Sequence, residues 1–242
     1  MKKRIAKMVL CALVLASVTS NCVYAESTKT KEISFRSIPW YSTKADTEEI
    51  LYGEGASEGG WSSDTENIYR MSGIDYPNVT NGSDRVDGGG YKGWYSSVSV
   101  AGYEASDTYA CYVYDIDENG VINKNADDAK LYFGWYIFDS NDYADVKVIY
   151  EDLEQKLVSL YGEGTSDKED DYFSSIIWSD AGNNQIRLLL GGKNKESQYI
   201  TLGYMAADAD VYLDEMQNAL DAEAMEDEAA EREENKNNVS GL

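Results

Sequence analysis

The sequence predicts an α+β protein made of two α-β-β-β repeats, with antiparallel sheet covered by helices and an acidic helix at the C-terminal end. The first observation is a repeat: Leu51–Ser57 returns as Leu160–Ser166, with six of seven residues identical at an offset of 109. The second is that each copy closes a stretch with helical character, and the third is that β-rich segments separated by turn residues follow each copy. Such self-similarity indicates two copies of one supersecondary unit.

The first 25 residues predict a secretory signal peptide, assigned to residues 1–25. Basic residues precede the apolar run Met8–Val18, and Val23 and Ala25 occupy the positions that a signal peptidase reads. The run is too short to cross a bilayer. We therefore expect a secreted, extracellular protein with no membrane span. An uncleaved anchor, or a lipid anchor on Cys22, is the alternative.

The first repeat is assigned to residues 26–128, and its last strand to 129–138. A short lead strand is predicted at Ile33–Phe35, followed by a capped helix at about Lys44–Tyr52. A long polar loop, residues 54–92, separates this helix from the strands. The strands are predicted at Trp94–Tyr103, Thr108–Asp115 and Lys130–Phe138.

The second repeat, residues 142–206, shows the same order more clearly. Apolar residues at helical spacing predict a helix at about Tyr143–Tyr161, and Gly162 ends it. Strands follow at Phe173–Ser179, Gln185–Leu190 and Tyr199–Met205. Two helices covering one face of two antiparallel meanders is the simplest assembly of these elements.

The chain ends in an acidic helical tail, residues 207–242. Its first turns carry apolar residues that can dock on the rest of the protein. Asp221–Lys236, in contrast, has high helix propensity and only Met225 as a large apolar group. A solvated helix that frays at its end explains this composition. An acidic arm that binds a partner is the alternative.

Composition excludes several classes of function. The chain has 44 acidic and 21 basic residues, for a net charge of −23, which disfavours nucleic acid as a partner. It has no histidine, which excludes Ser-His-Asp and Cys-His catalysis and the common zinc sites. Strand alternation places Cys111 on the same face of a β-rich segment as Tyr109 and Val113, so we expect a buried, inert thiol. The protein is therefore predicted not to be an enzyme, although a hydrolase that uses only paired carboxylates is an alternative.

One segment has the residues of a calcium-binding loop. Asp115, Asp117 and Asn119 place oxygen atoms at the first, third and fifth positions, and Gly120 stands at the sixth. The twelfth position, however, holds Ala126 in place of a bidentate acid. A β-hairpin turn explains the same residues, because Asp, Asn and Gly are turn formers. We therefore expect a hairpin turn and no cofactor, with calcium at this loop as the alternative.

The long polar loop and the strand that follows it hold the candidate ligand-binding residues. Long loops in compact domains are commonly functional, and exposed aromatic rings suit either a sugar or a protein hot spot. The alternative is that some of these rings fold back onto the core or form a further strand. The candidates are Trp61, Tyr69, Tyr76, Tyr91, Trp94 and Tyr95.

A resemblance supports a binding role. Ile38-Pro39-Trp40, the capped helix after it and the Leu-Tyr-Gly-Glu closure are similar to uncharacterised secreted proteins of Gram-positive bacteria. Their helix-plus-strands unit resembles the SmpA/OmlA lipoprotein domain and the tandem repeat of β-lactamase inhibitory protein. The resemblance implies a unit that binds other proteins without catalysis. The sequence thus predicts a secreted binding module for an extracellular protein or, alternatively, for a glycan or cell wall recognised through the aromatic loop.

Overall fold

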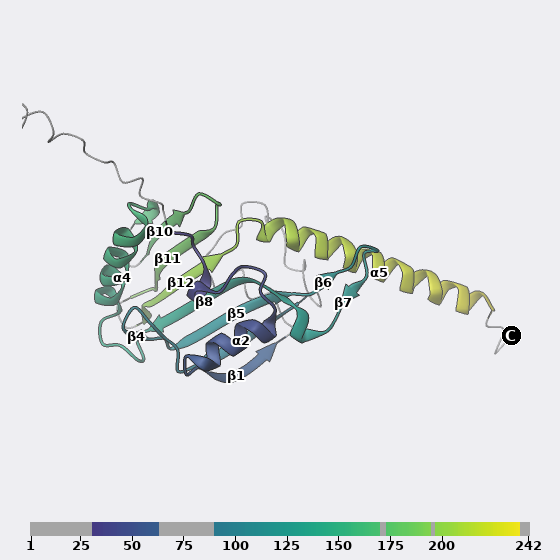
Figure 1. Cartoon of the computed structure of the whole chain (residues 1–242), viewed down its shortest axis with the longest axis horizontal. Coiled ribbons are helices and arrows are strands. Elements are labelled where there is room, and N and C mark those ends of the chain that lie inside the picture. Colours follow the sequence, from purple (N-terminus) through teal and green to yellow (C-terminus); the bar gives the residue numbers. More distant parts are fainter. Residues whose placement is uncertain (1–30, 63–89, 170–172, 195–196, 238–242) are drawn as a thin grey trace, which may run out of the picture. The chain divides into compact units, whose positions relative to one another are not determined.

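An eight-stranded antiparallel sheet organises the described part of the chain (Figure 1). The structure, a computed structural model, describes residues 31–62, 90–169, 173–194 and 197–237. The signal peptide predicted at residues 1–25 lies outside the described residues. In spatial order the strands are β1 (Ser57–Ser62), β2 (Gly90–Ser96), β5 (Asp107–Val113), β8 (Lys130–Asp139), β12 (Tyr199–Met205), β11 (Gln185–Gly191), β10 (Ser174–Ser179) and β9 (Thr165–Glu169).

Helices and short hairpins complete the fold, which is α+β as predicted. The α-helices are α2 (Lys44–Gly53), α4 (Val146–Tyr161) and the C-terminal α5 (Ala209–Asn237). The 3₁₀ turns are η1 (Phe35–Ser37) and η2 (Ala126–Asp128), and the hairpins pair β3 (Ser99–Val100) with β4 (Tyr103–Glu104) and β6 (Asp115–Ile116) with β7 (Ile122–Asn123). In the described part of the chain, no helix is both long and apolar enough to cross a membrane.

The helix α4 forms as its periodicity predicts. Asp145 caps its start by accepting a hydrogen bond from the backbone N–H of Lys147 at 3.2 Å. Its buried face is apolar, and Gly162 ends it with a φ of 82°, a conformation that glycine adopts at little cost. The buried residues of this face are Val146, Ile149, Tyr150, Leu153 and Leu157. Periodicity alone is therefore sufficient to locate this helix, apart from its first turn.

Both α2 and α4 contribute to the core on one face of the sheet, which we call the helix face. Alternate residues of the strands point into this core. They include Tyr112 of β5, Phe138 of β8, Leu188 of β11 and Leu202 of β12. Buried side chains from six strands and from both of these helices share one cluster, so the sheet is a single layer with a shared core.

The segment before α2 fills the core on the helix face, although we expected a lead strand at Ile33–Phe35. The backbone N–H of Ile33 donates to Asp180 Oδ2 at 2.7 Å, and Phe35 lies in a 3₁₀ turn. Its ring covers Gly134 in the middle of β8, where a Cβ would come within 2.6 Å of the ring. The expectation of a strand was wrong because the central strands already have partners on both edges, so these apolar residues pack on the sheet instead of joining it.

Four strands of the eight-stranded sheet follow α2 and four follow α4, in place of the three of the predicted repeat. The additional strands are β1, which falls inside the predicted loop 54–92, and β9. Both have polar sequences of low β-propensity, and β1 contains Gly59 and Gly60 at a bulge. They form because β2 and β10 offer free edges, and polar, charged residues are what exposed edge strands require. Residues 63–89 of the predicted loop lie outside the described residues.

The two halves of the sheet mirror each other in strand order. Each half is a meander of four main strands, and the last strands of the two meanders, β8 and β12, pair with each other. The repeated heptapeptides both connect a helix end to an edge strand. Their surroundings differ, however, because Leu51 is 1% exposed and Leu160 is 51% exposed. The fold therefore shows matching topology in the two halves but unequal packing of the repeated segment.

The first half of α5 covers part of the opposite face of the sheet. Leu213 and Met216 are buried there with Phe133 and Trp135 of β8. The ring of Tyr41 stacks on that of Tyr212 at a centroid distance of 5.1 Å. The second half of the helix is exposed, which agrees with the solvated tail that the composition predicts.

The contact between Phe35 and Gly134 gives a test of the fold. We expect Gly134→Ala to lower the free energy of unfolding by about 1–3 kcal/mol, because the added methyl group overlaps the Phe35 ring. Chemical denaturation measures this change. The control is Gly53→Ala, at a helical position with open space, which should be neutral or stabilising by up to about 1 kcal/mol. Equal effects of the two substitutions would contradict the packing described.

Candidate ligand-binding surface

Strand alternation separates the two neighbouring aromatic residues that the sequence proposes as ligand contacts. Trp94 points away from the helix face and is 42% exposed. Tyr95 points into the helix face and is 1% exposed. Successive side chains of a strand lie on opposite faces, so the pair cannot form one surface. Only Trp94 is available to a ligand.

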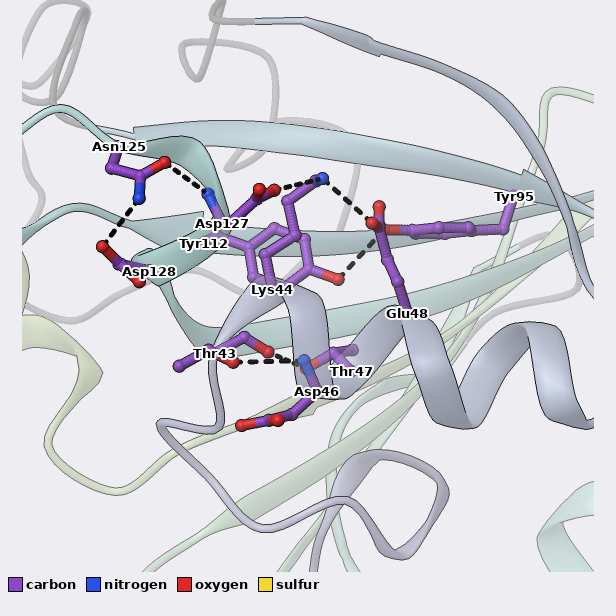
Figure 2. Close-up of polar contacts among 10 residues, drawn as sticks. All are labelled: Thr43, Lys44, Asp46, Thr47, Glu48, Tyr95, Tyr112, Asn125, Asp127 and Asp128. Carbon is purple, nitrogen blue, oxygen red and sulfur yellow. Dashed lines mark hydrogen bonds and ion pairs between the residues drawn. The ribbon is translucent and has the colours of Figure 1, made fainter.

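Tyr95 belongs to a polar network under α2, which Figure 2 shows. Its hydroxyl donates to Glu48 Oε1 at 2.9 Å and lies 3.0 Å from the Tyr112 hydroxyl. Glu48 also pairs with Lys44 at 2.9 Å, and Lys44 lies 3.5 Å from Asp127. Burial, and then the nearby Tyr112 hydroxyl, raise the pKa of Tyr95, which keeps it protonated as a donor. The network ties α2 to β2, β5 and η2.

Trp94 ends a row of aromatic rings that runs across three strands on the opposite face. Trp94 is the cross-strand partner of Tyr109, and Tyr109 is the partner of Trp135. The ring centroids lie 6.5 Å and 4.7 Å apart, and Phe133 follows at 5.1 Å from Trp135. We call these four residues the aromatic row. Trp135 and Phe133 are fully buried, Tyr109 is half-buried and Trp94 is exposed, so the row runs from the core to the surface.

Contacts on Trp94 and on its neighbour Tyr109 support the exposed end of the row. A Cβ at Gly59 of β1 would lie 3.0 Å from the Trp94 ring, so the indole is packed against the backbone of the edge strand. The ammonium group of Lys92 lies 5.3 Å from the centre of the Tyr109 ring, within the range of a cation–π contact. A ring fixed in this way loses little entropy when a ligand covers it.

Carboxylates lie beside the exposed end of the row. Burial raises the pKa of Asp107, and the negative charges of Asp139 and Asp142 raise it further, while a hydrogen bond from Trp94 acts in the opposite direction. These side chains supply hydrogen-bond acceptors next to a flat apolar ring. The surface can therefore stack on a ring or an apolar side chain and accept hydrogen bonds from its substituents.

The remaining aromatic candidates contribute no described side chain to this surface. Tyr69 and Tyr76 lie outside the described residues. Trp61 and Tyr91 lie in β1 and β2, but only their backbone is described. Sequence reasoning did not propose Tyr109, Trp135 or Asp107.

The structure places Asp115, Asp117 and Asn119 in the β6–β7 hairpin, in agreement with the turn interpretation. Asp117 Oδ1 accepts hydrogen bonds from the backbone N–H groups of Asn119 at 2.8 Å and Val121 at 2.9 Å. Both bonds lower the pKa of Asp117, and the bond from Val121 has the larger effect. Within residues 31–62, 90–169, 173–194 and 197–237, no three acidic, cysteine or histidine side chains converge on a position that could hold a metal ion. Calcium binding at the hairpin stays the untested alternative.

Cys111 is fully buried on β5, as expected from the strand face that it shares with Tyr109 and Val113. Burial raises the pKa of its thiol well above the usual value, which disfavours the reactive thiolate.

The chain matches no protein-family model, no curated protein and no solved structure. The candidate surface is therefore interpreted from its own chemistry, which allows stacking on Trp94 and hydrogen bonding to the carboxylates beside it.

The network under α2 gives a second test. We expect Tyr95→Phe to lower the free energy of unfolding by about 1–3 kcal/mol, because Glu48 and Tyr112 each lose a buried hydrogen-bond partner. Urea denaturation followed by circular dichroism measures the change. Tyr199→Phe removes the hydroxyl of a 40% exposed ring and should shift stability by less than about 0.5 kcal/mol. A Tyr95→Phe variant as stable as this control would argue against the network.

Proposed function

We propose that the chain is a secreted, non-enzymatic binding module whose ligand contacts the sheet at the exposed end of the aromatic row. The observation that carries the proposal is Trp94: an indole that is 42% exposed, yet packed between a neighbouring ring and the backbone of β1. Large, rigid aromatic side chains at a surface are the residues that most often dominate binding energy. The preferred ligand class is another extracellular protein.

The architecture and the resemblance support a binding scaffold. We propose that the two halves descend from a duplicated unit of helix and strands, because the order of the strands in one meander mirrors that in the other. The SmpA/OmlA domain and β-lactamase inhibitory protein, which the sequence resembles, use such units to bind proteins. A fold supports a class of function only by analogy, so the surface chemistry at Trp94 has to carry the assignment.

A glycan is the second candidate ligand, and the carboxylates beside Trp94 favour it. A sugar ring can stack on the indole while its hydroxyl groups donate hydrogen bonds to Asp107. The charges of Asp139 and Asp142 add to a negative field that suits a neutral or cationic ligand and disfavours an anionic polymer. A hydrolase that uses only carboxylates is the less favoured alternative, and turnover of a soluble glycan would reveal it.

The test is the loss of binding in Trp94→Ala. We expect this variant to bind at least about tenfold more weakly, because a central aromatic contact contributes about 2 kcal/mol or more. Co-sedimentation with insoluble polysaccharides measures binding to glycans. For protein ligands, the measurement is affinity capture of proteins secreted by the producing cells, followed by direct affinity measurement.

The matched control is Val148→Ala, which shortens a 58% exposed side chain on α4. It should bind like the unaltered protein on every ligand found. The proposed surface is wrong if a ligand is found and Trp94→Ala retains its full affinity. Circular dichroism of both variants confirms that the fold is retained.

A further inference from the structure

A groove lies between the β6–β7 hairpin and α5, on elements that the aromatic row does not use. It encloses about 660 Å³. Ile116 and Ile122, which are cross-strand partners, line it from the hairpin, and Ala219 and Ala222 line it from the helix. The small alanine side chains leave room between the walls. Val121, 62% exposed at the tip of the hairpin, extends the apolar strip.

Two polar contacts hold the walls of the groove together. The Tyr212 hydroxyl at the start of α5 donates to Asp115 Oδ1 at the base of the hairpin, at 3.4 Å. Further along the helix, Lys124 contacts both carboxylate oxygens of Glu223, at 2.8 and 2.9 Å. Ile116 and Ile122 also pack against the core under α5. The groove is thus a built feature of the fold.

The charged residues that line the groove are all acidic. Asp117, Glu215, Glu223 and Glu226 line it, and its lining residues include no lysine or arginine. Lys124 pairs with only one of these carboxylates. An occupant that carries several positive charges is therefore attracted by Asp117, Glu215 and Glu226.

The arrangement disfavours two other occupants. Among the described residues no three acidic side chains converge on one point, so the carboxylates are spread along the groove and do not surround a single cation. A second copy of the chain would bring a net charge of −23 to an acidic surface. Like-charge repulsion opposes that association.

We infer that the groove binds a cationic segment of a partner protein, in which lysine or arginine residues flank an aliphatic side chain. The aliphatic side chain lies between the hairpin isoleucines and the helix alanines, where it is removed from water. The flanking cations pair with the carboxylates of the rim. This recognition combines an apolar anchor in a groove with charge complementarity at its edges.

The experiment measures the affinity of the purified full chain for a short peptide of alternating lysine and leucine, by calorimetry at physiological salt. A lysine–serine peptide of equal charge is the comparison and should bind at least about tenfold more weakly, since it lacks the apolar anchor. Equal affinity for the two peptides would overturn the inference, because attraction would then be purely electrostatic.

Two pairs of variants locate the site. Ala222→Trp fills the groove and should weaken peptide binding at least about tenfold. Ala224→Trp, which is equally exposed on the same helix but does not line the groove, should not. Glu226→Lys should weaken binding more than Glu231→Lys, which changes the net charge equally outside the groove. Circular dichroism confirms that all four variants retain the helix.

Two results would overturn the assignment. One is an Ala222→Trp variant that binds the lysine–leucine peptide like the unaltered chain. The other is a concentration-dependent dimer that Ala222→Trp abolishes, which would make a second copy the occupant. Trp94→Ala should leave peptide binding unchanged, so failure of the proposed function and failure of this inference can be told apart.

Discussion

The pairing of β8 with β12 is the constraint on which the rest of the structure depends. It joins the last strands of the two meanders through seven cross-strand pairs and turns two small sheets into one. β8 is also paired with β5 on its other edge, and most of its side chains are buried on both faces. A strand of this kind is stable only if both faces of the sheet are covered. The cover on each face is therefore part of the fold and not an addition to it.

The need to cover both faces of the sheet explains the apolar segment before α2 and the first turns of α5. On the helix face, the gap between α2 and α4 is filled by Ile33 and Phe35, anchored by the backbone hydrogen bond to Asp180. Burial alone would raise the pKa of Asp180, but hydrogen bonds from Asn184, Ile33 and Gly182 hold it below its usual value, so the anchor stays charged. On the opposite face, the first turns of α5 cover Phe133, and the helix has no further core to cover after Leu220.

Local sequence patterns predicted the elements that they specify. They did not predict the strands that form only by pairing with a distant segment. The apolar runs of β8, β11 and β12 and the 3.6-residue periodicity of α4 are local signals. β1 and β9 carry no such signal, because an edge strand is specified by its neighbour. Trp94 was proposed as a ligand contact, but its support by Tyr109 depends on the register between β2 and β5, which alternation alone does not provide. Tyr95 differs, because alternation along the strand is by itself enough to place it on the opposite face from Trp94.

The exposed half of α5 is the part of the structure whose stability depends most on its surroundings. From Asp221 to Lys236 it buries no core, and the pair between Arg232 and Glu228, at 3.1 Å, is more than two-thirds exposed on both sides. Such pairs contribute at most about 0.5 kcal/mol each, while neighbouring carboxylates repel one another along the helix. Propensity alone sustains a helix only marginally in water, so a cation that binds the helical form more tightly than the unfolded form also stabilises the helix. Folding of the end of α5 and recognition of a basic partner are thereby linked through the same carboxylates.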